Sequence, residues 1–361
     1  MMYNILPSFS ARHVVAPLVI AATLLSASPV EAKRFKYSND GFEAWARLAL
    51  SSQVSALDTN MRARDSSNWN GDASLRLNLR WISDNALTYG LRVEYDSNTH
   101  TAEDLKRDEI YAYMVGSFGR LEVGEQDGPA DRLAFHAPIT ALGQIRGDFS
   151  RYVGSQALLS AYDTSDAAKL IFLSAPMKGW RYGVSYAPEY TRNQDAVDPR
   201  DRTRQRNAME FGVQYQQDIG EWVGGLSGGY VTGDSDASTQ RADLDSWSVG
   251  GELRHGRFTF GTAYVWRGDS NLRTANYDQE EVNMGVSWRG RKWQGRKWRA
   301  ALSAASVTSS GRDYDLLGVG MSMEVIRHLH WRADLVQYNE TSLLNGKQRA
   351  TVFITELELR I

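Results

Sequence analysis

Residues 225–229 read Gly-Leu-Ser-Gly-Gly, a match to the pattern that surrounds the nucleophilic serine of many hydrolases. That chemistry needs a sharp turn from a strand into a helix, which presents the serine to a histidine and a carboxylate. Ser227 instead lies in an alternating, glycine-rich segment with no helical pattern after it. We therefore interpret the match as a strand whose small residues ease packing or curvature, and we predict no catalytic residue.

A polar connection further along could bind calcium through carboxylate oxygens. The candidate ligands are Asp234 and Asp236, with Asp243 and Asp245 downstream. The segment lacks the glycine and the final glutamate of an EF-hand loop, so a solvated acidic loop is the favoured interpretation. Beyond a possible structural calcium ion we predict no cofactor, since the chain has no cysteine and no nucleotide-binding motif.

Two other groups could bind metal or nucleic acid. His328 and His330 have the spacing of metal ligands on one strand face, but no third ligand is evident. Residues 289–299 contain Gly-Arg-Lys-Trp twice. Their position at a predicted short turn favours an interfacial aromatic pair with basic side chains. The formal net charge of only −2 gives no reason to expect a nucleic-acid partner, and we predict none.

The N-terminal segment has the features of a secretory leader. Arg12 and His13 precede an apolar run over 14–25, and Val30 and Ala32 suit cleavage after residue 32. A membrane anchor would need about 20 continuous apolar residues, and Pro17 interrupts a shorter run. The sequence predicts a leader over residues 1–32 and an exported domain over residues 33–361.

The exported part repeats one pattern, in which apolar side chains occupy every second position of segments of about ten residues. In residues 74–81 the leucines and a tryptophan alternate with serine, arginine and asparagine, and residues 87–95 behave alike. We count sixteen such segments. Mean hydropathy is only −0.45, as expected when alternate residues face lipid and water.

The connections divide into two classes that alternate along the chain. One class is short, as at 83–85 and 255–257, and the other is long and polar, as at 58–72, 188–206, 307–313 and 339–348. Tryptophans lie beside the short connections, as interfacial girdles require. These features predict an all-β fold, a transmembrane antiparallel up-and-down β-barrel of 16 strands, and they disfavour a soluble secreted sandwich.

Residues 107–133 carry a more specific signal. They read as a strand, a Phe-Gly-Arg turn, a strand ending in Val-Gly and the start of a long loop. In this order the chain resembles the Gram-negative general porins, most closely the type found in alphaproteobacteria. The resemblance implies a homotrimer of sixteen-stranded barrels in the bacterial outer membrane, with lipid and lipopolysaccharide as partners.

The resemblance also implies that the third long loop, here residues 126–167, folds into the pore and narrows it. Family pores commonly set acidic loop residues against basic wall residues. The charged candidates in this loop are Asp127, Asp131, Arg132, Arg146 and Asp148. The wall candidates follow from strand parity, which places Arg76, Arg80 and Arg92 on the inward face of two neighbouring strands, where they would favour anions.

We therefore expect a passive diffusion channel for small hydrophilic solutes and ions. A substrate-selective channel with a binding site in the pore is the first alternative. A non-conducting adhesion or hydrolase barrel is a further one, for which we find neither a smaller strand number nor a catalytic Ser-His pair.

Overall fold

A computed structural model describes residues 35–61, 67–98, 103–192, 203–235, 242–268, 278–290, 296–344 and 346–361. The expected leader, residues 1–32, lies outside these described residues. Within the described ranges, no helix has the length and apolarity needed to cross a membrane.

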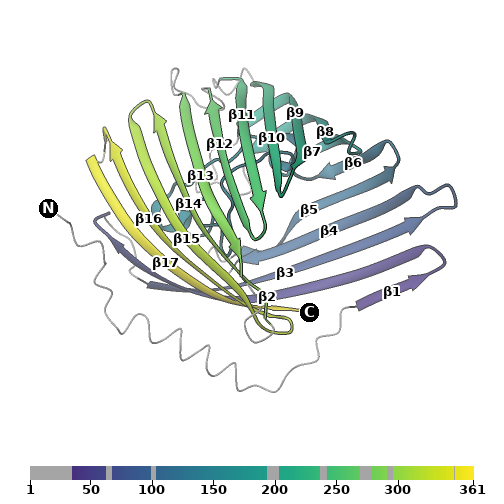
Figure 1. Cartoon of the computed structure of the whole chain (residues 1–361), viewed down its shortest axis with the longest axis horizontal. Coiled ribbons are helices and arrows are strands. Elements are labelled where there is room, and N and C mark those ends of the chain that lie inside the picture. Colours follow the sequence, from purple (N-terminus) through teal and green to yellow (C-terminus); the bar gives the residue numbers. More distant parts are fainter. Residues whose placement is uncertain are drawn as a thin grey trace.

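Sixteen antiparallel strands pair in chain order, and the last of them pairs with the first, which closes the sheet into a barrel (Figure 1). The strands of this ring are β2 (Phe42–Thr59), β3 (Ser67–Ile82), β4 (Thr88–Asn98), β5 (Glu103–Gly116), β6 (Gly119–Glu125), β7 (Ala168–Ser174), β8 (Trp180–Arg192), β9 (Thr203–Ile219), β10 (Trp222–Ser235), β11 (Leu244–His255), β12 (Phe258–Arg267), β13 (Gln279–Arg289), β14 (Trp298–Ser309), β15 (Arg312–Ile326), β16 (Leu329–Ser342) and β17 (Gly346–Arg360). The prediction of an all-β, sixteen-stranded barrel is confirmed.

Alternate residues of the strands face outward, as the period of two predicts. Leu77, Leu79 and Trp81 of β3 are 38%, 41% and 58% exposed on the outer surface, whereas Asn78 between them is buried. Large side chains exposed in this way suit contact with lipid hydrocarbon. Trp180 and Trp222, which begin β8 and β10 beside short turns, are also exposed, in agreement with an interfacial girdle.

Several strands extend further than their sequence pattern indicates. The connection expected over 307–313 is a two-residue turn, since β14 ends at Ser309 and β15 begins at Arg312. Likewise β16 continues to Ser342 and β17 starts at Gly346, within the loop expected over 339–348. Where a strand passes beyond the hydrocarbon layer both of its faces meet water, so the backbone pairing continues while the alternation disappears.

Part of the inner face is apolar and dry, which the alternation does not predict. Inward side chains of β14 to β17 pack against the long loop that enters the barrel. The buried cluster includes Val307, Leu316, Val336, Val352 and Ile354 from the wall, together with Ile145, Phe149, Val153 and Leu159 from the loop. The lumen is therefore reduced on this side, and the loop is held by hydrophobic contact.

The short strand β1 (Phe35–Asn39) completes one edge of β2. It pairs with the first five residues of β2, so that Phe35 lies opposite Ala46. Two backbone hydrogen bonds join Leu48 to Ile361, of 2.7 and 3.0 Å. Because β3 occupies the other edge of β2, β1 and β17 lie in line along one edge.

Candidate functional site

The connection over residues 126–167 lies inside the barrel and contains two short helices, α2 (Pro129–Arg132) and α3 (Ser150–Val153). Its first leg follows the inner wall. The backbone N–H of Phe135 donates to Ser227 Oγ on β10 at 2.7 Å, and that of Ala137 donates to Asn283 Oδ1 on β13 at 2.8 Å. Ser227 therefore holds the loop against the wall. The chain continues as strand from Ser227 to Ser235, without the strand-to-helix turn that the hydrolase pattern requires.

The loop turns at β2 and returns along the same wall. Asp148 accepts a hydrogen bond from Gln53 of β2 at 2.5 Å, and the hydroxyl of Tyr314 on β15 donates to the carbonyl of Gln156 at 2.9 Å. On the return leg the backbone N–H of Leu158 donates to Glu281 of β13 at 2.7 Å. The loop therefore lines the inner wall from β9 round to β2. It leaves most of the wall of β3 to β6 uncovered, apart from contacts near its two ends such as that of Arg132 with Glu122 of β6.

Inward-facing glycines let the loop approach this wall closely. A Cβ atom built at Gly212, Gly250 or Gly261 would collide with a backbone carbonyl oxygen of the loop. The carbonyl groups concerned belong to Pro129, Phe135 and His136. These strand glycines accordingly have a positional role, which is to admit a second backbone.

The three predicted wall arginines share the inner face of β3 and β4, as parity indicates. Arg76 and Arg92 both form ion pairs with Glu94, and Arg80 Nη2 lies 2.6 Å from Glu43 Oε2. The arginine side chains are 27–41% exposed, whereas that of Glu94 is 8% exposed. The guanidinium groups therefore cover their carboxylate partners and form the layer that meets the lumen.

An equally important group on β5 and β6 was not predicted from the sequence. The side chain of Glu122 is 1% exposed and is bound by Arg120 of the wall and by Arg132 of α2. The guanidinium of Arg120 lies 4.1 Å from the ring centroid of Tyr113. The register places Tyr113 opposite Glu122, so strand parity extended through residues 107–125 could have identified these residues.

Several predicted loop residues also pair with other residues of the loop. Asp131 accepts a hydrogen bond from Ser160 Oγ at 2.5 Å and lies 3.8 Å from Arg146. Asp148 lies 3.6 Å from Arg151. Acidic and basic groups are therefore interleaved on the loop as they are on the wall, and the structure does not divide them into one acidic and one basic side.

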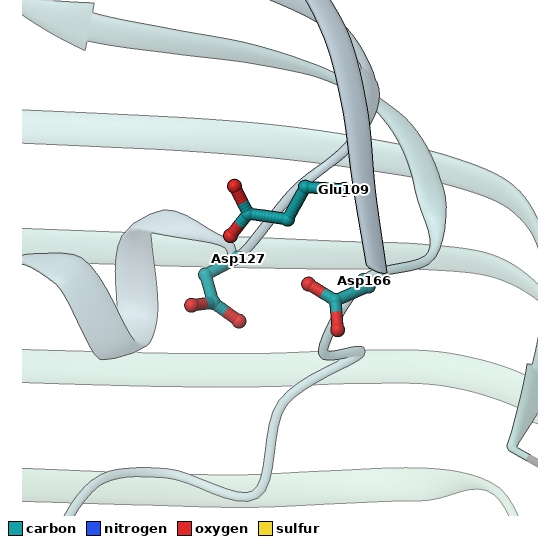
Figure 2. Close-up of side chains that lie close together, drawn as sticks. All are labelled: Glu109, Asp127 and Asp166. Carbon is teal, nitrogen blue, oxygen red and sulfur yellow. The ribbon is translucent and has the colours of Figure 1, made fainter. Parts of the chain in front are cut away.

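Three carboxylates meet where the loop leaves β6 and where it returns to β7. Glu109, Asp127 and Asp166 each have a carboxylate oxygen within 4.8 Å of the other two, and their side chains point toward one another in Figure 2. Burial, followed by the nearby charge of Asp131, raises the pKa of Asp127 above its usual range. This group makes the entrance to the loop sensitive to protonation.

The candidate calcium ligands lie elsewhere, at the end of β10. Asp234 accepts a hydrogen bond from Asn207 Nδ2 at 2.9 Å, and Asp236 lies outside the described residues. Calcium binding there stays a prediction.

The closed barrel, the inward loop and the charged inner wall agree with a family profile described as Gram-negative porin, which matches residues 34–324. The chain belongs to the Gram-negative porin family. The porin is therefore a passive diffusion channel of the bacterial outer membrane. No curated protein sequence is significantly similar to it.

Solved structures of outer-membrane proteins share its fold. The porin is similar to the outer membrane channel DcaP of Acinetobacter baumannii, with a TM-score of 0.63 and 10% identity over 91% of this chain and 100% of that one. It is similar to OmpT of Vibrio cholerae in its trimer form, with a TM-score of 0.61 and 13% identity over 89% and 100%. It is also similar to a variant of Rhodobacter blastica porin, with a TM-score of 0.55 and 14% identity over 88% of this chain and 100% of that one. Identities this low establish the common fold alone.

Proposed function

We propose that the porin is a general diffusion pore for small hydrophilic solutes and ions, constricted between the long loop and the wall of β3 to β6. The observation that carries the proposal is the path of the loop, which lines the inner wall from β9 to β2 and leaves the charged wall facing it. The constriction residues are Asp127, Asp131, Arg132, Arg146 and Asp148 on the loop, with Arg76, Arg80 and Arg92 on the wall.

The charge arrangement supports a weak preference between cations and anions. Each of the three wall arginines has a carboxylate partner within ion-pair distance, and the loop charges are mixed in sign. Paired opposite charges largely cancel at distances beyond about 8–10 Å in physiological salt. We therefore infer that solute size, more than net charge, decides passage.

The proposal includes assembly and location of the chain. The V. cholerae OmpT structure is described as a trimer, and we infer a homotrimer for this porin too. Its exposed apolar band and aromatic residues suit contact with lipid, and lipopolysaccharide is the expected neighbour in the outer leaflet. Export would use residues 1–32 as a leader, cleaved after Ala32.

We also infer that the porin is not an enzyme. The serine of its hydrolase-like motif belongs to a strand and binds the loop backbone through its hydroxyl. A serine nucleophile needs its hydroxyl presented to a general base at a sharp turn. A structural role accounts for Ser227 without catalysis.

Conductance of the purified, folded protein in planar bilayers tests the proposal. We expect stable steps that are ohmic in potassium chloride, with a small reversal potential across a salt gradient. Liposome swelling should slow steeply as sugars increase in size. Folded protein that gives no conductance would contradict the proposed function.

A further inference from the structure

We propose that the inner wall of β4 to β6 carries a weak binding subsite for small planar carboxylate anions, built by Arg120 and Arg92 above Tyr113 and Tyr111. The inference rests on the proposed diffusion function, since the subsite lies on the wall that faces the long loop. It assigns a solute class to residues that the general pore mechanism does not distinguish.

A stacked pair of rings and guanidinium groups forms the floor of the subsite. The ring of Tyr113 lies against Gly90, because a Cβ atom built there would collide with it. The guanidinium of Arg120 lies over this ring at 4.1 Å, and that of Arg92 lies 5.9 Å from the centroid of Tyr111. Stacking on tyrosine orders a guanidinium group before any solute arrives, which reduces the entropy lost on binding.

The same wall exposes hydrogen-bond donors and hides acceptors. Arg120 and Arg92 have side chains that are 29% and 27% exposed, whereas those of Glu122 and Glu94 are 1% and 8% exposed. Arg120 binds Glu122 through Nε. Within the part of the chain that the structure describes, Arg120 Nη1 and Nη2 donate no hydrogen bond. A solute at this wall therefore meets donors, and it must bring its own acceptors.

A carboxylate satisfies this requirement best. Its two oxygens match the planar fork of a guanidinium and form charge-assisted hydrogen bonds. An aromatic ring attached to that carboxylate can also lie flat along the stacked wall. A neutral sugar needs protein acceptors for its hydroxyl groups, and the carboxylates of Glu94 and Glu122 are already bound by arginine.

Benzoate provides the experimental probe. Chloride is replaced stepwise by benzoate at constant ionic strength, and the single-channel current is recorded in planar bilayers. We expect the current to fall along a saturating curve, whereas glucose added at the same concentrations should give no saturation. A channel that conducts potassium chloride but shows no saturation with benzoate contradicts the subsite and leaves the diffusion function intact. Absence of any conductance contradicts the diffusion function itself.

Substitutions locate the effect. In Arg120→Gln the carboxylate of Glu122 keeps its partner Arg132, so the barrel should fold. We expect benzoate affinity to fall about tenfold, the equivalent of about 1.4 kcal/mol for one charge-assisted contact. Arg120→Lys keeps the charge but loses the planar fork, so it should also weaken binding, and it replaces the glutamine variant if that one misfolds.

Arg254→Gln is the matched control. Arg254 Nε lies 3.0 Å from Glu252 Oε1, two residues away on the same strand, and Arg120 pairs with Glu122 in the same way. The substitution removes one positive charge from the inner face of β11. This variant should bind benzoate as the wild type does. Equal losses in both variants, an unchanged affinity in the Arg120 variants, or saturation with glucose as well would each overturn the proposal.

Discussion

Lys169 and Glu210 form an ion pair of 3.1 Å between side chains that are 0% and 1% exposed. The pair connects the start of β7 with the middle of β9, at the point where the long loop returns to the wall. Lys169 Nζ also donates a hydrogen bond to the carbonyl of Ser165 at 2.6 Å. A buried charge that loses its partner is strongly destabilising. The end of the loop is therefore fixed electrostatically as well as by packing.

Lys169→Met should lower the free energy of unfolding by about 3–5 kcal/mol, because it leaves the carboxylate of Glu210 buried without its cation. Chemical denaturation of the detergent-solubilised barrel measures this loss. Lys178→Met is the control, since Lys178 is exposed in a short turn and should change stability by less than about 0.5 kcal/mol. Adding Glu210→Gln to the Lys169 variant should recover much of the stability, because glutamine removes the unpaired charge and keeps an acceptor for the backbone N–H of Thr164. Equal effects of the Lys169 and Lys178 substitutions would contradict the role of the pair.

Gly250→Ala should push the loop away from the wall, because the new Cβ would collide with the carbonyl oxygen of Phe135. We expect a loss of stability of about 1–3 kcal/mol and a smaller single-channel conductance, as the loop moves into the lumen. Gly251→Ala, one residue along on the outer face, meets only ordinary contacts of 3.7 Å and should leave the conductance unchanged. Identical conductance in both variants would show that the glycine does not position the loop.

Ser227→Ala should leave the backbone N–H of Phe135 without its acceptor, at a cost of about 1–3 kcal/mol. The variant should still conduct, and the wild type should not hydrolyse esters. Thermal unfolding together with an ester-hydrolysis assay tests both statements. Hydrolysis by the wild type that disappears in the variant would restore the catalytic interpretation of the motif.

Acidification should shift the selectivity of the channel toward anions at a higher pH than an ordinary aspartate would allow. Burial and the nearby charge of Asp131 raise the pKa of Asp127 above its ordinary value of 3.8. The carboxylate of Asp127 therefore takes up a proton at a higher pH than an ordinary aspartate does. A raised carboxyl pKa means that the folded loop binds the proton more tightly, so protonation stabilises the loop arrangement. Reversal potentials measured between about pH 7 and pH 4 should shift toward anions in the wild type and shift less in Asp127→Asn. Asp243→Asn, in an external connection, should behave like the wild type.

Period-two alternation was sufficient to predict the sixteen strands and the inward position of Arg76, Arg80 and Arg92, because lipid imposes a strict choice on each outward residue. The strand ends were predicted poorly, since outward residues beyond the hydrocarbon layer need not be apolar, and the strands continue there to positions such as Arg312 and Ser342. Alternation also missed Val352 and Ile354, which face inward yet are apolar because the loop covers them.

The sequence predicted which residues line the candidate site better than it predicted how these residues pair with one another. The loop charges could be named from the sequence, but their partners could not. Asp148 bonds to Gln53 only because the loop follows the inner wall round to β2, and Arg132 reaches Glu122 only because α2 lies close to β6. Inward-facing glycines such as Gly250 could have indicated the path of the loop. Glycines on the inner parity of successive strands indicate where a second backbone lies against the wall.

The short hairpin of β1 and β2 restricts the register in which the barrel can close. β1 and β2 are neighbours in sequence and can pair before any distant contact forms, which occupies the edge of β2 from Phe42 to Ala46. The pairing of the final strand with β2 reaches Leu48, opposite Ile361, and residues 42–46 of the same edge are paired with β1. A shift of β17 along β2 would change the shear of the whole barrel. Because β1 already pairs with residues 42–46, it limits the register in which β17 can close the barrel.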